Sequence, residues 1–263
     1  MLDFIFYINL WLLFSILIIS FLFANFICFK LGQMQRVNTS NDAKTEVTGI
    51  QVAFFGLLAL LLAFSFTMSA TRFETRKQLI LQESNAIGTS YLRTELLAQP
   101  QQLALQNTFR TYVATLLEFY NAAKNSNDIM ALNQQILNIQ NQLWSLGVAA
   151  AAKDPRPFYS IFFLTSLNSV IDDYNSLITS ARNHVPDLAI WLLFFVAIFT
   201  MGLTGYRNGL DDKPNNMSMI LCSIVIATVI FVILDLDRPV AGLIQVSEKN
   251  FIDLQNSIKA TAK

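Results

Sequence analysis

Few side chains in this sequence could carry chemistry. His184 is the only histidine, so metal sites built on several histidines and nucleophilic triads with a histidine base lack their parts. No GxSxG, Walker A or HExxH motif occurs either. We therefore expect no enzyme and no resident metal or cofactor. His184, just before Pro186, is expected at a membrane boundary, as a hydrogen-bonding residue or as a proton sensor, because histidine titrates near neutral pH.

Glu83 is the most unusual acidic residue, because at helical spacing it shares a stripe with Leu79, Ile80 and Ile87. We expect a semi-buried carboxylate, which needs a partner or a cation. Two interpretations stay open. One is a structural pair with a basic residue such as Arg93 or Arg182, and the other is a carboxylate that lines a water-filled path.

Asp235 and Asp237 close the last apolar run of the chain. Acidic groups near a helix C-terminus oppose the helix dipole, so something must compensate for them. We predict ion pairs at the membrane boundary that also involve Arg72, Arg76 and Arg238. A divalent cation held by the two aspartates is the alternative, although two carboxylates rarely suffice without further oxygen ligands.

Four apolar runs must position these residues. They cover residues 4–29, 49–70, 185–206 and 217–234. A bilayer core roughly 30 Å thick requires roughly 20 apolar residues in a helix, so each run can span it. Hydrocarbon offers the backbone no hydrogen-bond partner, and the runs must therefore be helices. The sequence predicts a multi-pass integral membrane protein in contact with the lipid bilayer.

The second run carries the clearest functional pattern. Small residues recur along it at near-heptad spacing, which lets helix backbones approach closely. This small-residue stripe contains Gly56, Ala59, Ala63, Thr67 and Ala70. Beside it, Gly56, Leu60 and Phe64 recur every four residues. Ordinary helix packing is one interpretation, and a ring of apolar side chains around an oligomer axis, which gates by dewetting, is the other.

Between the two pairs of spans, the pattern is helical. Residues 71–184 are predicted to form a soluble helical domain continuous with the second span, with a turn at 124–128, a heptad in residues 129–146 and a further helix that follows 154–157. The C-terminal tail, 237–263, is expected to pack on this domain. The fold class is thus all-α, with transmembrane pairs in 1–70 and 185–236 flanking a helical bundle.

The charge of the chain bears on its partners but leaves its orientation in the membrane open. The net charge is zero, which gives no reason to expect a nucleic-acid partner. Basic residues near the spans are almost equally divided between the two sides of the membrane, so the positive-inside rule does not orient the chain.

Several segments together resemble the signature of the bestrophin-like domain family, a group of small, mainly bacterial membrane proteins of unassigned function. The segments are Arg72-Phe73-Glu74 with Arg76, Glu83, residues 85–89, Tyr91-Leu92-Arg93, Leu167-Asn168, Ile171-Asp172, His184-Val185-Pro186, residues 235–239, Gly242, residues 244–247 and Asp253-Leu254. The resemblance covers nearly the whole chain. A more distant similarity links this family to bestrophins, which are pentameric anion channels with a cytoplasmic helical domain.

The bestrophin resemblance implies specific roles. Thr71-Arg72-Phe73 is similar to the end of the bestrophin pore helix, and this register places Gly56, Leu60 and Phe64 on the three neck positions. Glycine departs from the large apolar residues found there. The calcium clasp of animal bestrophins is reduced to Asp235 and Asp237, so calcium gating is not implied.

The resemblance also implies a pentamer in the bacterial inner membrane, with the helical domain in the cytoplasm and inorganic ions, chloride among them, as the permeant species. Our hypothesis is a homo-oligomeric ion channel or pore that conducts anions. The alternative is a non-conducting membrane interaction or sensor protein whose helical domain recruits a partner.

Overall fold

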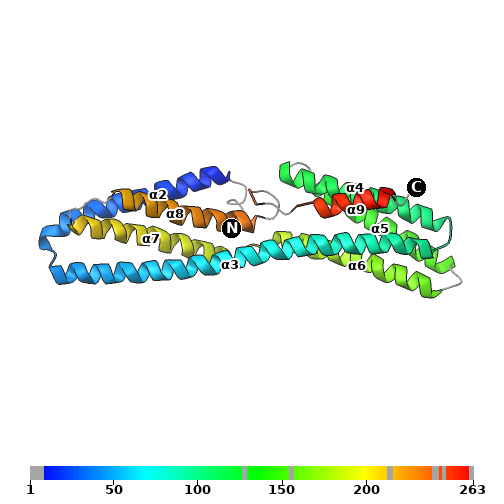
Figure 1. Ribbon diagram of the computed structural model, residues 1–263, viewed down its shortest axis with the longest axis horizontal. Helices are drawn as coiled ribbons and strands as arrows, with labels where there is room; N and C mark the ends of the chain where they lie inside the picture. The colour runs from blue at the N-terminus through cyan, green and yellow to red at the C-terminus, as the bar shows by residue number, and fades with distance from the viewer. Residues whose placement is uncertain are drawn as a thin grey trace. The chain divides into compact units, whose positions relative to one another are not determined.

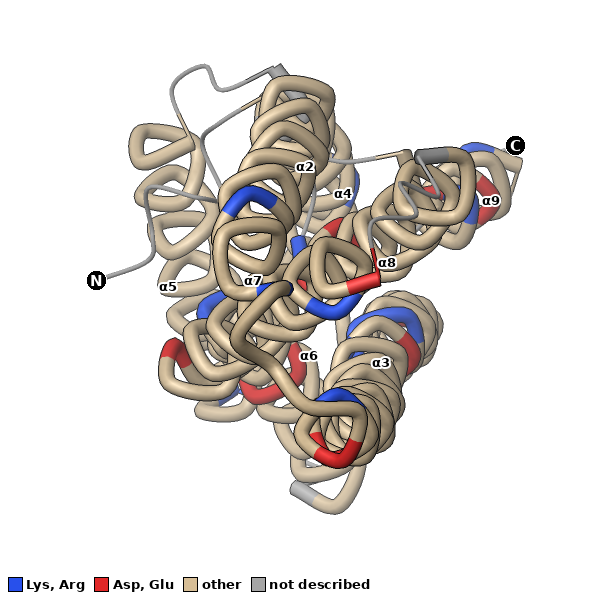
Figure 2. Tube along the Cα trace, turned by 90° about the vertical axis from the view of Figure 1, so that its left-hand side faces the viewer, with Lys and Arg blue, Asp and Glu red and all other residues tan. Residues whose placement is uncertain are grey.

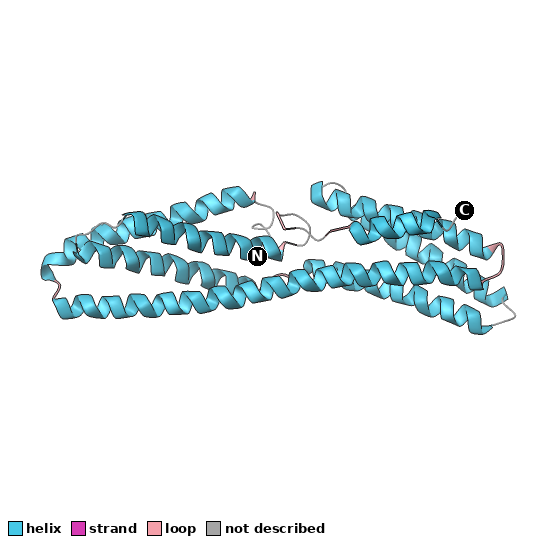
Figure 3. Ribbon diagram, in the orientation of Figure 1, coloured by secondary structure: helices cyan, strands magenta, loops and turns pink. Residues whose placement is uncertain are grey.

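The computed structural model describes residues 9–125, 129–153, 157–211, 216–238, 243–244 and 247–260. The regular structure in these ranges is helical and contains no strand (Figure 3). The predicted all-α fold class is therefore confirmed. Parts of several predicted features lie outside the described residues, namely the start of the first span at 4–8, most of the turn at 124–128, the segment 154–156 before the next helix, and the tail segments 239–242, 245–246 and 261–263.

Helices long and apolar enough to cross a bilayer are present at all four expected places. They are α2 (Leu10–Gln35), the first part of α3 (Asn41–Arg93), α7 (Asp187–Asp211) and α8 (Asn216–Asp237). Each continues past the end of its apolar run, α3 the furthest, because helical hydrogen bonds remain favourable after the side chains become polar. The prediction of four spans is confirmed.

The start of α7 carries one acidic residue. Asp187 lies inside the predicted run 185–206, where it occupies the first turn of the helix. A carboxylate is favourable there because it faces the positive end of the helix dipole. Pro186 precedes it and its carbonyl accepts the Ala189 N–H at 2.9 Å, which starts the hydrogen-bond ladder.

The chain divides into two compact units. The first, which we call the membrane unit, consists of Met1–Arg72 and His184–Arg238, and the second, the helical domain, of Phe73–Asn183 and Pro239–Lys263. In the membrane unit α2, α7 and α8 run side by side (Figure 1). Charged residues form short, separate bands along tubes that are otherwise uncharged (Figure 2).

Within the membrane unit, α2 and α7 approach so closely that their backbones touch. A Cβ on Gly205 would collide with the Asn25 carbonyl, one on Gly209 with the Phe29 carbonyl, and one on Gly32 with the Tyr206 carbonyl. Nearby, the buried Asn25 amide donates to the Met201 carbonyl at 3.2 Å. Glycines at i and i+4 with an interhelical polar contact are the usual means of helix association in lipid.

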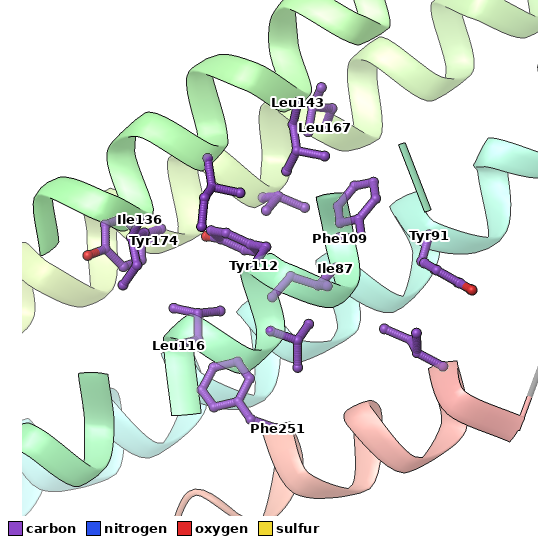
Figure 4. Close-up of a cluster of buried hydrophobic side chains, with 14 of the residues drawn as sticks. Ile87, Tyr91, Phe109, Tyr112, Leu116, Ile136, Leu143, Leu167, Tyr174 and Phe251 are labelled. Carbon is purple, nitrogen blue, oxygen red and sulfur yellow. The ribbon is translucent and has the colours of Figure 1, made fainter. Parts of the chain in front are cut away.

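The helical domain combines the second part of α3 with α4 (Gln101–Asn125), α5 (Ile129–Lys153), α6 (Pro157–Arg182) and α9 (Lys249–Ala260). Its core gathers apolar side chains from all five helices, with Tyr112 near the centre (Figure 4). The predicted heptad lies in α5, and Ile136, Ile139 and Leu143 from it are buried. In α9, Phe251 is fully buried and its ring lies 5.2 Å from that of Tyr120 in α4.

Replacing Gly205 by alanine should destabilise the membrane unit. The new methyl group would displace α7 from the α2 backbone, and overpacking of this kind costs about 1–3 kcal/mol. The measurement is the thermal unfolding midpoint of the purified protein in detergent, which should fall clearly.

Gly49→Ala is the matched control, because a Cβ at Gly49 meets nothing within 4 Å. Alanine in a helix is favoured over glycine by roughly 0.5–1 kcal/mol, so this variant should melt at or above the wild-type temperature. Equal melting temperatures for the two variants would contradict the close α2–α7 contact.

Candidate functional site

The face of α3 that carries Gly56, Leu60 and Phe64 is open in the single chain. The Leu60 side chain is 52% exposed and the Phe64 side chain 61%, and a Cβ on Gly56 would meet nothing within 4 Å. Leu58, on the other side of the helix, is only 2% exposed. One side of α3 thus packs into the core of the membrane unit, and the side with these three residues is uncovered.

The spacing of these three residues aligns them along the helix. Residues four apart on an α-helix lie one above the other, roughly 6 Å apart. The surface is apolar and carries no ionisable group, so it cannot coordinate an ion. It can exclude water wherever copies of it surround a narrow space.

The small-residue stripe borders the same open face. Ala59, Ala63 and Thr67 are exposed, and Ala70 is half-buried. The tight helix contact inside the chain is therefore elsewhere, between α2 and α7, and the stripe does not make it. The sequence did contain a signal for the α2–α7 contact, the Gly205-x-x-x-Gly209 pattern in α7. Our predictions considered small residues only in the second span and did not include it. A packing role for the stripe between copies of the chain stays a prediction.

The basic residues predicted at the membrane boundary include one that is almost completely buried. The Arg76 side chain is 3% exposed, and its guanidinium donates to the carbonyls of Asn183 at 3.0 Å and Ser180 at 3.4 Å. Ser180 lies in the last turn of α6, and its carbonyl also accepts the Asn183 N–H at 3.2 Å. Asn183 follows the helix directly, at the end where the last C=O groups point out of the helix. A guanidinium is well suited to this place because its charge also complements the helix dipole.

The acidic residues at the end of α8 are buried as well. Asp237 is fully buried and accepts the Val185 N–H, at 3.0 Å on one oxygen and 3.2 Å on the other. The Nδ1 atom of His184 lies 3.4 Å from Oδ2 of Asp237. Asp237 therefore joins the end of α8 to the residues that precede α7.

Asp235 and Arg238 are 1% and 8% exposed, and the Arg238 N–H donates to the Asp235 carbonyl at 3.2 Å. The predicted pairing of Arg72 and Arg76 with Asp235, Asp237 and Arg238 stays a prediction. The alternative was a divalent cation held by the two aspartates. Among the described residues, no group of three or more His, Cys, Asp or Glu side chains is placed so that it could hold a metal ion.

Glu83 is fully buried, deeper than the semi-buried position expected from its stripe. Its hydrogen-bond partner is not an arginine: the Tyr112 hydroxyl donates to Oε1 at 3.3 Å, and Arg93 donates to the Phe162 carbonyl instead. Burial, together with the nearby charge of Asp173, raises the pKa of Glu83 from 4.5 to about 8, although the hydrogen bond from Tyr112 lowers it. At neutral pH this side chain is mostly a neutral carboxylic acid.

Comparison with solved structures gives the same fold over nearly the whole chain. A point mutant of a bacterial bestrophin homologue from Klebsiella pneumoniae matches with a TM-score of 0.66 at 13% identity, covering 92% of this chain and 98% of that one. Another structure of a bestrophin homologue from Klebsiella pneumoniae gives 0.59 at 12% identity over 94% and 99%. A point mutant described as a membrane protein gives 0.62 at 15% identity, over 91% and 98%.

Comparison with curated proteins gives no match. A family model, in contrast, matches most of the sequence: the model of the Bestrophin-like domain covers residues 17–251. The matched range includes most of α2 and all of α3 to α8, and with them every site residue discussed above. The chain therefore belongs to the Bestrophin-like domain family.

Proposed function

We propose that this protein is a homo-oligomeric ion channel in which α3 of each copy lines the path, with Gly56, Leu60 and Phe64 at the constriction. The observation that carries the proposal is how little of α3 is covered in the single chain. In its most apolar stretch only 6% of the residues are buried, against 22% in α2 and 39% in α8. The span with the most open surface is the one that copies of the chain can enclose.

The composition of this open surface favours protein over lipid as its neighbour. Gly56, Ala59, Ala63 and Thr67 are small, and small residues on a membrane helix allow the backbone of another helix to come close. Leu60 and Phe64 alternate with them along the helix. A closed ring of copies would place Ala59, Ala63 and Thr67 at contacts between neighbours and turn Leu60 and Phe64 toward the axis.

A ring built in this way would gate by wetting. Leu60 and Phe64 of each copy would form two stacked apolar rings roughly 6 Å apart, and an apolar constriction empties of water when it is narrow enough. Gly56 would leave a wider opening one turn away. Anions, with chloride as the test ion, and a pentameric assembly are proposed from the family resemblance.

One observation favours the second candidate function, a non-conducting protein whose helical domain recruits a partner. Phe158, Ile161 and Phe162 lie on one side of α6 and are 66%, 59% and 42% exposed. An apolar patch of this kind is typical of a protein contact. A protein can have both a pore and a partner surface. A measurement of ion flux therefore tests whether this protein conducts ions.

Phe64→Ala should raise chloride flux through the purified protein in liposomes several-fold, because it removes the larger apolar ring. Phe66→Ala is the matched control: Phe66 is also exposed, at 44%, but lies about 200° further around the helix. It should leave flux at the wild-type level. Background flux in the wild type, Phe64→Ala and Leu60→Ala alike would favour the non-conducting alternative.

Cysteine cross-linking tests the oligomer itself. With Cys28 and Cys222 replaced by serine, Leu60→Cys and Phe64→Cys should form disulfide-linked dimers under mild oxidation, because an axis brings equivalent residues of neighbouring copies together. Phe66→Cys should stay monomeric on a non-reducing gel. Dimers from position 66 alone, or from none of the three, would contradict a ring with Phe64 turned inward.

A further inference from the structure

The helical domain contains an acid that the proposed pore does not use. Glu83 is fully buried in the helical domain, and within the described part of the chain one of its oxygens, Oε2, has no hydrogen-bond partner. Its other oxygen accepts from Tyr112, whose hydroxyl in turn accepts from the Gln140 amide at 2.9 Å. A chain of donors thus runs from α5 through α4 to the carboxyl on α3 and ends there.

Among the residues that the structure describes, the titratable groups that act on Glu83 are acidic or phenolic and supply no positive charge to balance an ionised carboxylate. From α4 the titratable neighbours are Tyr112 and Tyr120, and from α6 they are Asp173 and Tyr174. On α5 the polar neighbours are neutral amides: Gln140, and Asn133, which accepts from Tyr174 at 2.7 Å. On α9 the buried Phe251 ring belongs to the same core, and the Asn250 carbonyl accepts from Ser84, the residue next to Glu83, at 3.1 Å.

A carboxyl is a costly choice for this position if structure is its only role. A glutamine has the same shape, could accept the same hydrogen bond from Tyr112, and never ionises. Burying an ion without a partner destabilises a fold strongly, whereas burying the neutral acid costs far less. The property that the carboxyl adds is its ability to lose a proton.

We propose that Glu83 is a proton-binding site, and that release of its proton loosens the packing of α3 against α4 and α5 in the helical domain. This property is independent of conduction and goes beyond the proposed channel. The ligand is the proton itself. It is held on a fully buried carboxyl in the core to which Tyr112, Ile80 and Ile87 belong. The helical domain would then be tighter in acid and looser in alkali.

The direction of the pH effect follows from linkage. Below about pH 4.5 Glu83 is protonated in both the folded and the unfolded chain, so ionisation costs no stability. As the pH rises from 4.5 to 8, the unfolded chain releases the proton and the folded chain retains it, so stability falls steadily. Above pH 8 both forms are ionised and the loss reaches its full value.

The test is the infrared carbonyl band of protonated carboxylic acids, recorded on the full-length protein in detergent from mildly acidic to alkaline pH. A band that disappears with a midpoint near pH 8 in the wild type and is missing in Glu83→Gln supports the proposal. Glu118→Gln changes an exposed acid on α4 and is the control, which should keep the band. A wild type with no band at neutral pH, or one that Glu83→Gln leaves intact, overturns the proposal.

A second variant covers the case in which Glu83→Gln does not fold. The hydrogen bond from Tyr112 lowers the pKa of Glu83, so Tyr112→Phe should move the midpoint to higher pH. An unchanged or lower midpoint would overturn the assignment to Glu83.

Amide hydrogen exchange measures the conformational part of the proposal. After correction for the intrinsic pH dependence of exchange, wild-type amides in residues 80–90 and 109–116 should lose protection across the same midpoint. Those of Glu83→Gln should keep constant protection, and those of Tyr112→Phe should lose it at that variant's own, higher midpoint. Constant protection in the wild type would show a proton site without the structural response and would contradict the loosening.

Discussion

The inability of hydrocarbon to accept or donate hydrogen bonds is the constraint on which the rest of this structure depends. It makes every segment inside the bilayer a helix, and it also removes the hydrophobic effect as a reason for those helices to associate. Close packing must then do so. The contact of α2 with α7 meets this need, since Gly32, Gly205 and Gly209 let two backbones touch where any side chain would hold them apart.

The same constraint gives α3 its special position. In water, an apolar face as open as that of Leu60 and Phe64 would be covered or would cause aggregation. In a membrane it can remain open, to lipid or to further copies of the chain. Because α3 continues as one helix from Asn41 to Arg93, the helix that would line the pore also supplies Glu83 to the core of the helical domain.

Ionisable groups, unlike this apolar face, cannot be left without a partner in a low-dielectric environment. A buried charge must be paired with an opposite charge or a hydrogen-bond partner, or the group must become neutral. Arg76 and Asp237 are matched by backbone groups, the carbonyls that end α6 and the amide of Val185. Glu83 has a single phenolic donor and an acidic neighbour, so its proton is retained to a higher pH than usual. Two solutions to one electrostatic problem thus occur in one chain, and the second of them makes the fold sensitive to pH.

Sequence patterns determined the membrane class, the four spans and the helical domain, because length, apolar content and helical periodicity are local properties of the chain. Short motifs spread along the sequence indicated the family. The residues of the open α3 face were also named in advance. Their role could not be predicted from the sequence, since a helical period of 3.6 gives the residues that share a face but not what covers that face.

The tertiary structure alone decided which groups the ionisable side chains meet. The pattern at Glu83 predicted an acid in an apolar stripe and left its surroundings open between a basic side chain and a water-filled path, whereas folding supplied the Tyr112 hydroxyl from 29 residues away. Asp237 was expected to meet side chains, and the fold also gives it a backbone N–H 52 residues distant in the sequence. Backbone groups are the same at every position, so no residue pattern can mark them as partners. Only the path of the folded chain brings them within hydrogen-bond distance.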